Sequence, residues 1–135
     1  MKVIADTNVL LRITTRDDPG QAHVAEDALK QATLVAITLP AVCELAWVLK
    51  RGYKQTSEQI ARVIGGLLAI SVVRIDRAPV EAGLAMLEAG GDFADGVIAY
   101  EGQRLGGETL LTFDRKAAAL MIASGRAVTL LSARG

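Results

Sequence analysis

The sequence predicts an α/β fold in which a central parallel sheet of about five strands is flanked by helices on both faces. Short apolar runs rich in β-branched residues alternate with longer segments of helical period along the chain. The first run, residues 3–5, is apolar throughout, as expected of a strand covered on both faces. Neither a linker nor a repeat interrupts the 135 residues, so we expect a single domain over residues 1–135.

The strands are expected where the short apolar runs lie, and the helices where apolar residues recur every three or four positions. The expected strands cover residues 3–5, 34–37, 72–75, 110–111 and 128–131. The expected helices cover residues 8–15, 21–31, 38–52, 56–68, 76–90, 92–106 and 116–123. Since strands separated by helices pair in parallel through right-handed crossovers, this order indicates one sheet.

Local signals set several of the boundaries. Residues 17–20, Asp-Asp-Pro-Gly, predict a turn. Thr38 is expected to cap a helix that ends at Gly52, and Thr56 with Gln59 has the spacing of a capping box. Asp76 is expected to cap the helix that follows it.

Composition narrows the class of protein. The chain has 15 acidic and 15 basic residues, a balance that argues weakly against an unspecific nucleic-acid binder. A single Cys43 and a single His23 exclude a disulfide framework and a zinc cluster, and suit a reducing cytoplasm. The longest nearly apolar stretch, residues 63–73, is shorter than the roughly 20 residues of a membrane span. We therefore expect a soluble, cytoplasmic protein that does not enter a membrane.

Four acids stand at positions typical of a functional site. Asp6 and Asp114 each follow a strand and precede a helix, so both are expected at the carboxyl edge of the sheet, where ligands bind in open parallel sheets. Asp95 lies in the first turn of its helix, where the helix dipole favours an anion. Glu44 lies inside an otherwise apolar helix, where an unpaired acid is unusual.

Four clustered carboxylates repel one another, and no Lys or Arg adjoins Glu44 or Asp95 in the sequence. A divalent cation would remove this repulsion. Because hard oxygen ligands are present without His or Cys, the pattern indicates Mg²⁺ or Mn²⁺, and such a site suits phosphoryl chemistry. The number of metal ions is left open.

Each acid also has a structural interpretation. Asp6 and Asp114 could cap the helices that follow them, and Asp95 could serve as a partner of the helix dipole. Asp92 is three residues before Asp95 on nearly the same face, so either could be the third ligand. Asp95 is favoured because Asp92 follows a Gly-Gly pair and is well placed to cap the helix.

With these acids placed, the sequence resembles the PIN-domain family and, within it, the VapC-type ribonuclease toxins of toxin–antitoxin pairs. The resemblance covers the whole chain and rests on four segments taken together: residues 5–12, 44–49, 92–99 and 111–115. Gly96 departs from the more usual Ala, at a cost of up to about 1 kcal/mol in a helix.

The resemblance implies a Mg²⁺- or Mn²⁺-dependent endoribonuclease that is a homodimer and is neutralised by a small antitoxin protein. It identifies Asp6, Glu44, Asp95 and Asp114 as the catalytic, metal-binding quartet, and Thr7, Asn8 and Thr112 as polar residues that steady it. Basic residues near these acids are candidates for gripping the RNA backbone. They are Arg12, Arg16, Lys50, Arg51, Lys54 and Arg115.

An apolar surplus in so small a domain supports a partner surface. An amphipathic antitoxin peptide carrying Arg could pair with the carboxylates and displace the metal. The helix over residues 40–50 is the expected groove, with Trp47 either its anchor or buried in the core.

The sequence bears on three alternative functions. A response-regulator receiver would need paired acids after the first strand and a Lys after the fifth, and the sequence has neither. A dinucleotide-binding module would need Gly-x-Gly-x-x-Gly after the first strand, which is missing. A non-catalytic module with the same fold that binds a partner protein or RNA stays open, because ligand identity does not prove turnover.

Overall fold

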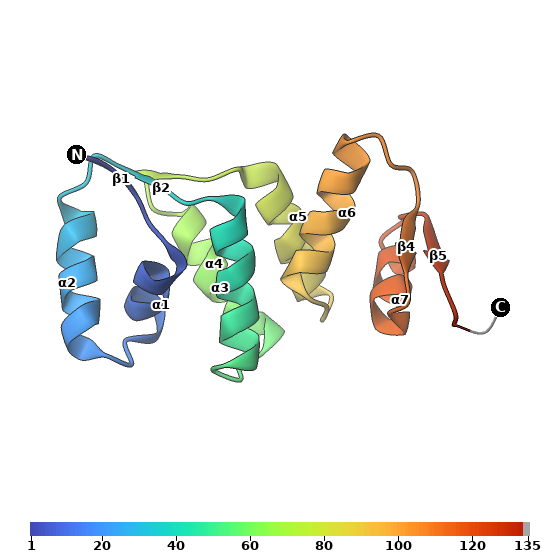
Figure 1. The fold of residues 1–135 in the computed structure, drawn as a ribbon, viewed down its shortest axis with the longest axis horizontal. Coiled ribbons are helices and arrows are strands. Elements are labelled where there is room, and N and C mark those ends of the chain that lie inside the picture. Colours follow the sequence, from blue (N-terminus) through green and yellow to red (C-terminus); the bar gives the residue numbers. More distant parts are fainter. Residues whose placement is uncertain (134–135) are drawn as a thin grey trace.

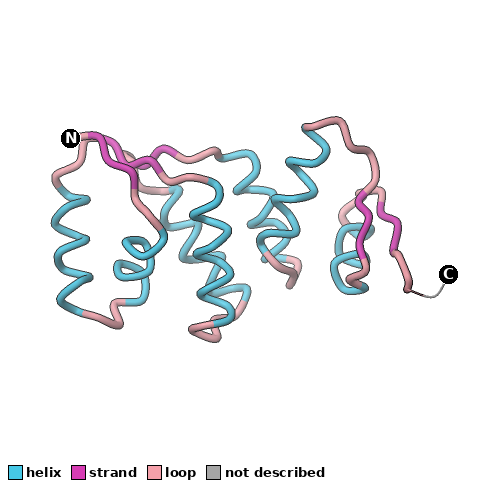
Figure 2. The backbone as a smooth tube through the Cα atoms, in the orientation of Figure 1, coloured by secondary structure: helices cyan, strands magenta, loops and turns pink. Residues whose placement is uncertain are grey.

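The computed structural model describes residues 1–133, in which five short strands alternate with seven helices (Figure 1). The strands are β1 (Lys2–Ile4), β2 (Leu34–Ala36), β3 (Val73–Arg74), β4 (Leu110–Thr112) and β5 (Val128–Leu130). The helices are α1 (Thr7–Thr15), α2 (Pro19–Lys30), α3 (Leu39–Arg51), α4 (Ser57–Leu68), α5 (Arg77–Glu88), α6 (Phe93–Arg104) and α7 (Arg115–Ala123). Helix dominates the chain, as Figure 2 shows.

All the strand pairs are parallel, as the sequence predicts, and they form two groups. The first is a sheet in the order β1-β2-β3, in which Val3 pairs with Val35 and Val35 with Val73. The second joins β4 to β5, with Leu111 opposite Thr129. The expected α/β class and the five parallel strands are therefore confirmed. Within residues 1–133 the strands are hydrogen-bonded as three plus two, and Figure 1 places β4 and β5 at the end of the molecule opposite β1.

Helix starts follow the expected capping chemistry at several places. The Thr38 hydroxyl accepts a hydrogen bond from the Ala41 N–H at 3.3 Å, and α3 ends at the expected Gly52. At α4 the capping box is complete, since Thr56 accepts from the Gln59 N–H at 3.1 Å and Gln59 accepts from the Thr56 N–H at 2.9 Å. These side chains satisfy N–H groups that a helix leaves without internal partners.

One local prediction was wrong, and a second is confirmed only in part. The expected turn over residues 17–20 is shorter, because α2 already begins at Pro19 with Asp18 as its cap. Proline suits the first turn of a helix, where its missing N–H costs nothing. Asp76 occupies the N-cap position of α5 but makes no side-chain capping hydrogen bond.

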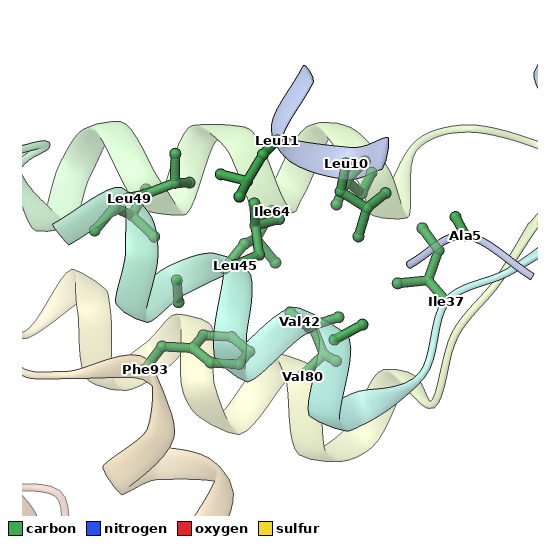
Figure 3. Close-up of a cluster of buried hydrophobic side chains, with 14 of the residues drawn as sticks. Ala5, Leu10, Leu11, Ile37, Val42, Leu45, Leu49, Ile64, Val80 and Phe93 are labelled. Carbon is green, nitrogen blue, oxygen red and sulfur yellow. The ribbon is translucent and has the colours of Figure 1, made fainter. Parts of the chain in front are cut away.

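The main hydrophobic core lies between the three-stranded sheet and the helices α1, α3, α4, α5 and α6. Figure 3 shows Leu45 and Leu49 of α3 facing Ile64 of α4, with Phe93 reaching from α6 toward α3. A second, smaller cluster joins α7 to α5 and α6 through Met86, Ala99, Ala117 and Met121. This second cluster fixes the unit of α7, β4 and β5 against the rest of the chain.

Glycine allows α5 and α6 to approach closely. A Cβ at Gly96 would lie 2.4 Å from the Ala82 carbonyl oxygen, and one at Gly83 would lie 2.5 Å from the Phe93 ring. The helix-propensity cost of Gly96 therefore accompanies a tight helix contact that alanine cannot make. The departure from alanine noted in the sequence thus has a structural reason.

Among the described residues, none of the helices is both long and apolar enough to cross a membrane.

Candidate active site

Asp6 lies two residues after the end of β1, Asp114 lies two residues after the end of β4, and each caps the helix that follows. The Asp6 carboxylate accepts a hydrogen bond from the Val9 N–H at 3.0 Å, and the Asp114 carboxylate accepts one from the Ala117 N–H at 2.9 Å. In each case the accepting oxygen is Oδ1, so both acids do play the structural capping role expected as an alternative. Since a carboxylate has two oxygens, capping leaves Oδ2 available for a ligand.

Thr112 steadies the second of these acids. Its hydroxyl accepts a hydrogen bond from the Asp114 N–H at 3.0 Å, which holds the turn between β4 and α7. Thr7 is the first residue of α1 and is half-buried, while Asn8 is exposed. Both follow Asp6 directly in the chain.

Glu44 lies on α3, six residues after the Thr38 cap, and is exposed to solvent. The expectation that this acid is anomalous because it is buried among apolar residues was therefore wrong. The buried face of α3 consists of Ala41, Val42, Leu45, Ala46 and Leu49, and Glu44 lies beside that face. An exposed acid carries no desolvation cost and needs no special partner.

Asp95 lies half-buried in the first turn of α6. Burial raises the pKa of its half-buried carboxyl, and the negative charges of Asp92 and Asp114 raise this pKa further, while Lys50 opposes them. Two acids and one base therefore surround Asp95, and they come from α3, from the start of α6 and from the end of β4. Of the expected quartet, Asp114 is near enough to Asp95 for its negative charge to contribute to the raised pKa of Asp95.

Asp92 does not cap α6 through its side chain, which corrects the reason for preferring Asp95. Its carboxylate instead forms an ion pair with the Lys50 ammonium, 42 positions earlier in the chain. Asp92 is thereby neutralised by a fixed base, whereas no base pairs directly with Asp95 among the described residues. Asp95 remains the favoured third acid, for a different reason.

Within residues 1–133, no group of three or more His, Cys, Asp or Glu side chains stands close enough together to hold a metal ion. Asp6 and Glu44 are thus not gathered with Asp95 and Asp114 into one such cluster. Asp95 and Asp114 nevertheless suit a hard divalent cation, since Mg²⁺ commonly binds through one or two carboxylates together with water and substrate phosphates. A cation there would also relieve the repulsion that raises the Asp95 pKa.

The candidate RNA-gripping residues fall into two groups. Arg12 donates to Asp17 at 2.5 Å and to the Tyr53 hydroxyl at 3.5 Å, and Arg16 pairs with Glu26, so both are held in local contacts. Lys50 pairs with Asp92. Elsewhere in the part of the chain that the structure describes, Arg51, Lys54 and Arg115 are exposed and make no ion pair.

A small cavity of about 100 Å³ lies between α3 and the start of α6. Its lining includes Cys43, Trp47, Lys50, Asp92 and Asp95. Trp47 is 62 % exposed, so the alternative that buries it in the core was wrong. Sequence reasoning missed this grouping because the α3 and α6 residues are more than 40 positions apart, and no local pattern indicates that they meet.

The model of the PIN-domain family matches residues 3–122. The chain therefore belongs to the PIN-domain family, whose members are generally metal-dependent nucleases. A comparison with curated proteins gives no significant match.

Proposed function

We propose that this PIN-domain chain is a Mg²⁺- or Mn²⁺-dependent endoribonuclease that acts in the cytoplasm as the toxin of a toxin–antitoxin pair. The observation that carries the proposal is the environment of Asp95. This half-buried carboxyl has Asp114 and Asp92 as acidic neighbours, and Lys50 is already paired with Asp92. Family membership supports nuclease chemistry at this acidic site.

Asp95 and Asp114 would hold the metal, and Asp6 and Glu44 are proposed as its further ligands. A bound divalent cation supplies a Lewis acid for the phosphodiester and lowers the pKa of a water molecule. Hydrolysis of the phosphodiester would add a water oxygen to phosphorus and return a proton to the leaving oxygen. The chain contributes position: the capping bonds of Asp6 and Asp114 fix one oxygen of each carboxylate, and Thr112 fixes the turn beneath Asp114.

The substrate proposed is RNA held mainly through its backbone. Arg51 and Arg115 are the best candidates for phosphate contacts, since they are exposed and free of ion pairs among the described residues. Arg115 directly follows Asp114, and Arg51 lies at the end of α3. Guanidinium groups bind phosphate oxygens through two parallel hydrogen bonds, which positions the strand without reading its sequence.

The decisive experiment is RNA cleavage by the purified protein with Mg²⁺, with Mn²⁺ and with a chelator. We expect cleavage that requires metal and is abolished in Asp95→Asn. Asp92→Asn should retain most activity, because Asp92 is engaged with Lys50 rather than with the metal. An intact, folded protein that binds RNA but never cleaves it would favour the alternative, a non-catalytic module that binds RNA or a partner protein.

The toxin role, the homodimer and the antitoxin rest on the resemblance to VapC-type proteins. The exposed apolar side chains of the described region include Ile98, Leu105 and Phe113, which is consistent with a surface that a partner covers. Expression alone should arrest growth, and co-expression with the product of a small neighbouring reading frame should restore it. Light scattering of the purified protein should give about twice the chain mass of 14.2 kDa.

A further inference from the structure

Trp47 is the sole tryptophan of the chain, and its side chain is exposed to solvent beside the proposed site. It lines the same small cavity as Asp95 and Asp92. An indole offers a large flat apolar face, and exposing that face to water is unfavourable. A residue 62 % exposed at this position therefore offers a surface on which a flat ligand can stack.

The neighbours of Trp47 on α3 are charged. Glu44 is three positions before it and Arg51 four positions after it, so the three side chains share one face of the helix. From Glu44 to Arg51 the helix rises about 10 Å. The indole thus stands between the acidic residues and a guanidinium that makes no ion pair among residues 1–133.

This mixture of groups distinguishes RNA from a protein partner. A protein surface that docks on Trp47 would need a continuous apolar patch, whereas Glu44, Lys50 and Arg51 around the indole are all exposed and charged. Single-stranded nucleic acids combine flat bases with a negative backbone, and proteins bind them by pairing aromatic side chains with basic ones. Bases inside a double helix are stacked on one another and cannot reach an indole.

We propose that Trp47 stacks on an unpaired base of single-stranded RNA next to the phosphodiester held at the acidic site, while Arg51 contacts a neighbouring phosphate. The inference deepens the proposed function, on which it rests, by specifying an unpaired base as the substrate feature. Trp47 touches the base and no reacting atom, so it is a binding residue. Every base has a flat face, so the contact selects unpaired RNA more than any one sequence.

The test uses the fluorescence of Trp47 itself, which reports on this position alone. A short oligouridylate is titrated into the wild-type protein in the presence of a chelator, so that no cleavage occurs. We expect strong quenching by this RNA, and little quenching by an abasic ribose-phosphate strand of the same length and charge. Equal quenching by both strands would mean that only the backbone is bound and would overturn the proposal.

Variants test the contact independently, with binding followed by the anisotropy of labelled RNA. Trp47→Ala should weaken oligouridylate binding roughly 5- to 150-fold, and Trp47→Phe should recover part of the loss. Val24→Ala is the matched control, because Val24 is another apolar side chain of a helix surface and is 69 % exposed. Unchanged affinity in a folded Trp47→Ala protein would contradict the inference.

Protein partners are an explicit outcome of the same experiments. If a second copy or another protein covers Trp47, the free protein should show blue-shifted emission shielded from acrylamide, and the inference is overturned. The test is also separable from catalysis. A protein that cleaves RNA but fails the quenching test keeps its nuclease function and loses the base contact. One that passes the quenching test without ever cleaving keeps the contact and loses the nuclease function.

Discussion

Around β1, β2 and β3 the chain builds one continuous core from five helices, whereas the unit of β4, α7 and β5 meets the rest through four buried residues. Val35 in the middle strand β2 is 2 % exposed, while Leu111 of β4 is 63 % exposed. The stability of the two regions should differ accordingly, because stabilisation follows the apolar area removed from water.

The candidate site depends on both regions. Asp6 and Glu44 belong to the first region, Asp114 belongs to the second, and Asp95 stands at the start of α6 between them. The better-packed region therefore holds Asp6 and Glu44 in place, and the lightly packed unit contributes Asp114. Because one of the four acids comes from the lightly packed unit, local unfolding of that unit would disrupt the whole candidate site.

The largest expected effect comes from the first region. Leu45 of α3 is fully buried in the main core, and Leu45→Ala should lower the free energy of unfolding by about 3–5 kcal/mol. Denaturant titration followed by circular dichroism measures this change. A loss below about 1 kcal/mol would show that this core is less tightly packed than described.

A smaller and more local effect is expected in the second region. Met121 of α7 is 2 % exposed, and Met121→Ala should cost about 2 kcal/mol by removing the centre of the small cluster. Amide exchange should then quicken in α7, β4 and β5 and stay unchanged in α3. Equal acceleration in all elements would mean that the two regions unfold as one.

The contact between α5 and α6 gives an intermediate test. Gly96→Ala adds a Cβ 2.4 Å from the Ala82 carbonyl oxygen, and this overpacking should outweigh the gain of about 1 kcal/mol in helix propensity. We expect a lower melting temperature. Gly102→Ala in the same helix is the control, because its Cβ meets nothing within 4 Å, and it should raise the melting temperature. Stabilisation by both substitutions would show that α5 and α6 are not in close contact.

The smallest effect concerns the surface of the first region. The hydrogen bond from Tyr53, and then that from Arg12, lower the pKa of Asp17 from 3.8 to about 2. Because the folded pKa is depressed, the carboxylate stabilises the fold above about pH 3.8 and loses that contribution as the pH falls to about 2. Asp17→Asn should therefore melt slightly lower than wild type at pH 6, with the difference vanishing near pH 2.

Glu88→Gln serves as the control for this pH series, since Glu88 is exposed and makes no ion pair among the described residues. Its melting temperature should follow that of the wild type at every pH. A difference between Asp17→Asn and wild type that is independent of pH would mean that the Asp17 carboxylate does not act through its charge.

Much of this architecture could be predicted from local chemistry. Thr38, Gly52 and the Thr56–Gln59 pair mark helix ends through short-range hydrogen bonds, and the structure confirms them. The exposure of Glu44 could not be predicted, because α3 is apolar almost all round and its periodicity does not show which face is buried. Which side chains meet at the site depends on packing between distant segments, which local patterns do not reveal. The ion pair of Lys50 with Asp92, 42 positions apart, is one example. That the whole chain forms one domain, and that the acids form a quartet, stay predictions.

The most direct test of the account is metal binding by acids from both regions, measured as the shift in melting temperature on adding Mn²⁺. A ligand that binds only the folded state must raise the melting temperature. We expect the wild type to gain stability and Asp95→Asn and Asp114→Asn to lose most of that gain. Asp6→Asn should lose it as well if β1 contributes to the same site. A metal-induced shift of equal size in the wild type and all three variants would contradict the proposed acidic site.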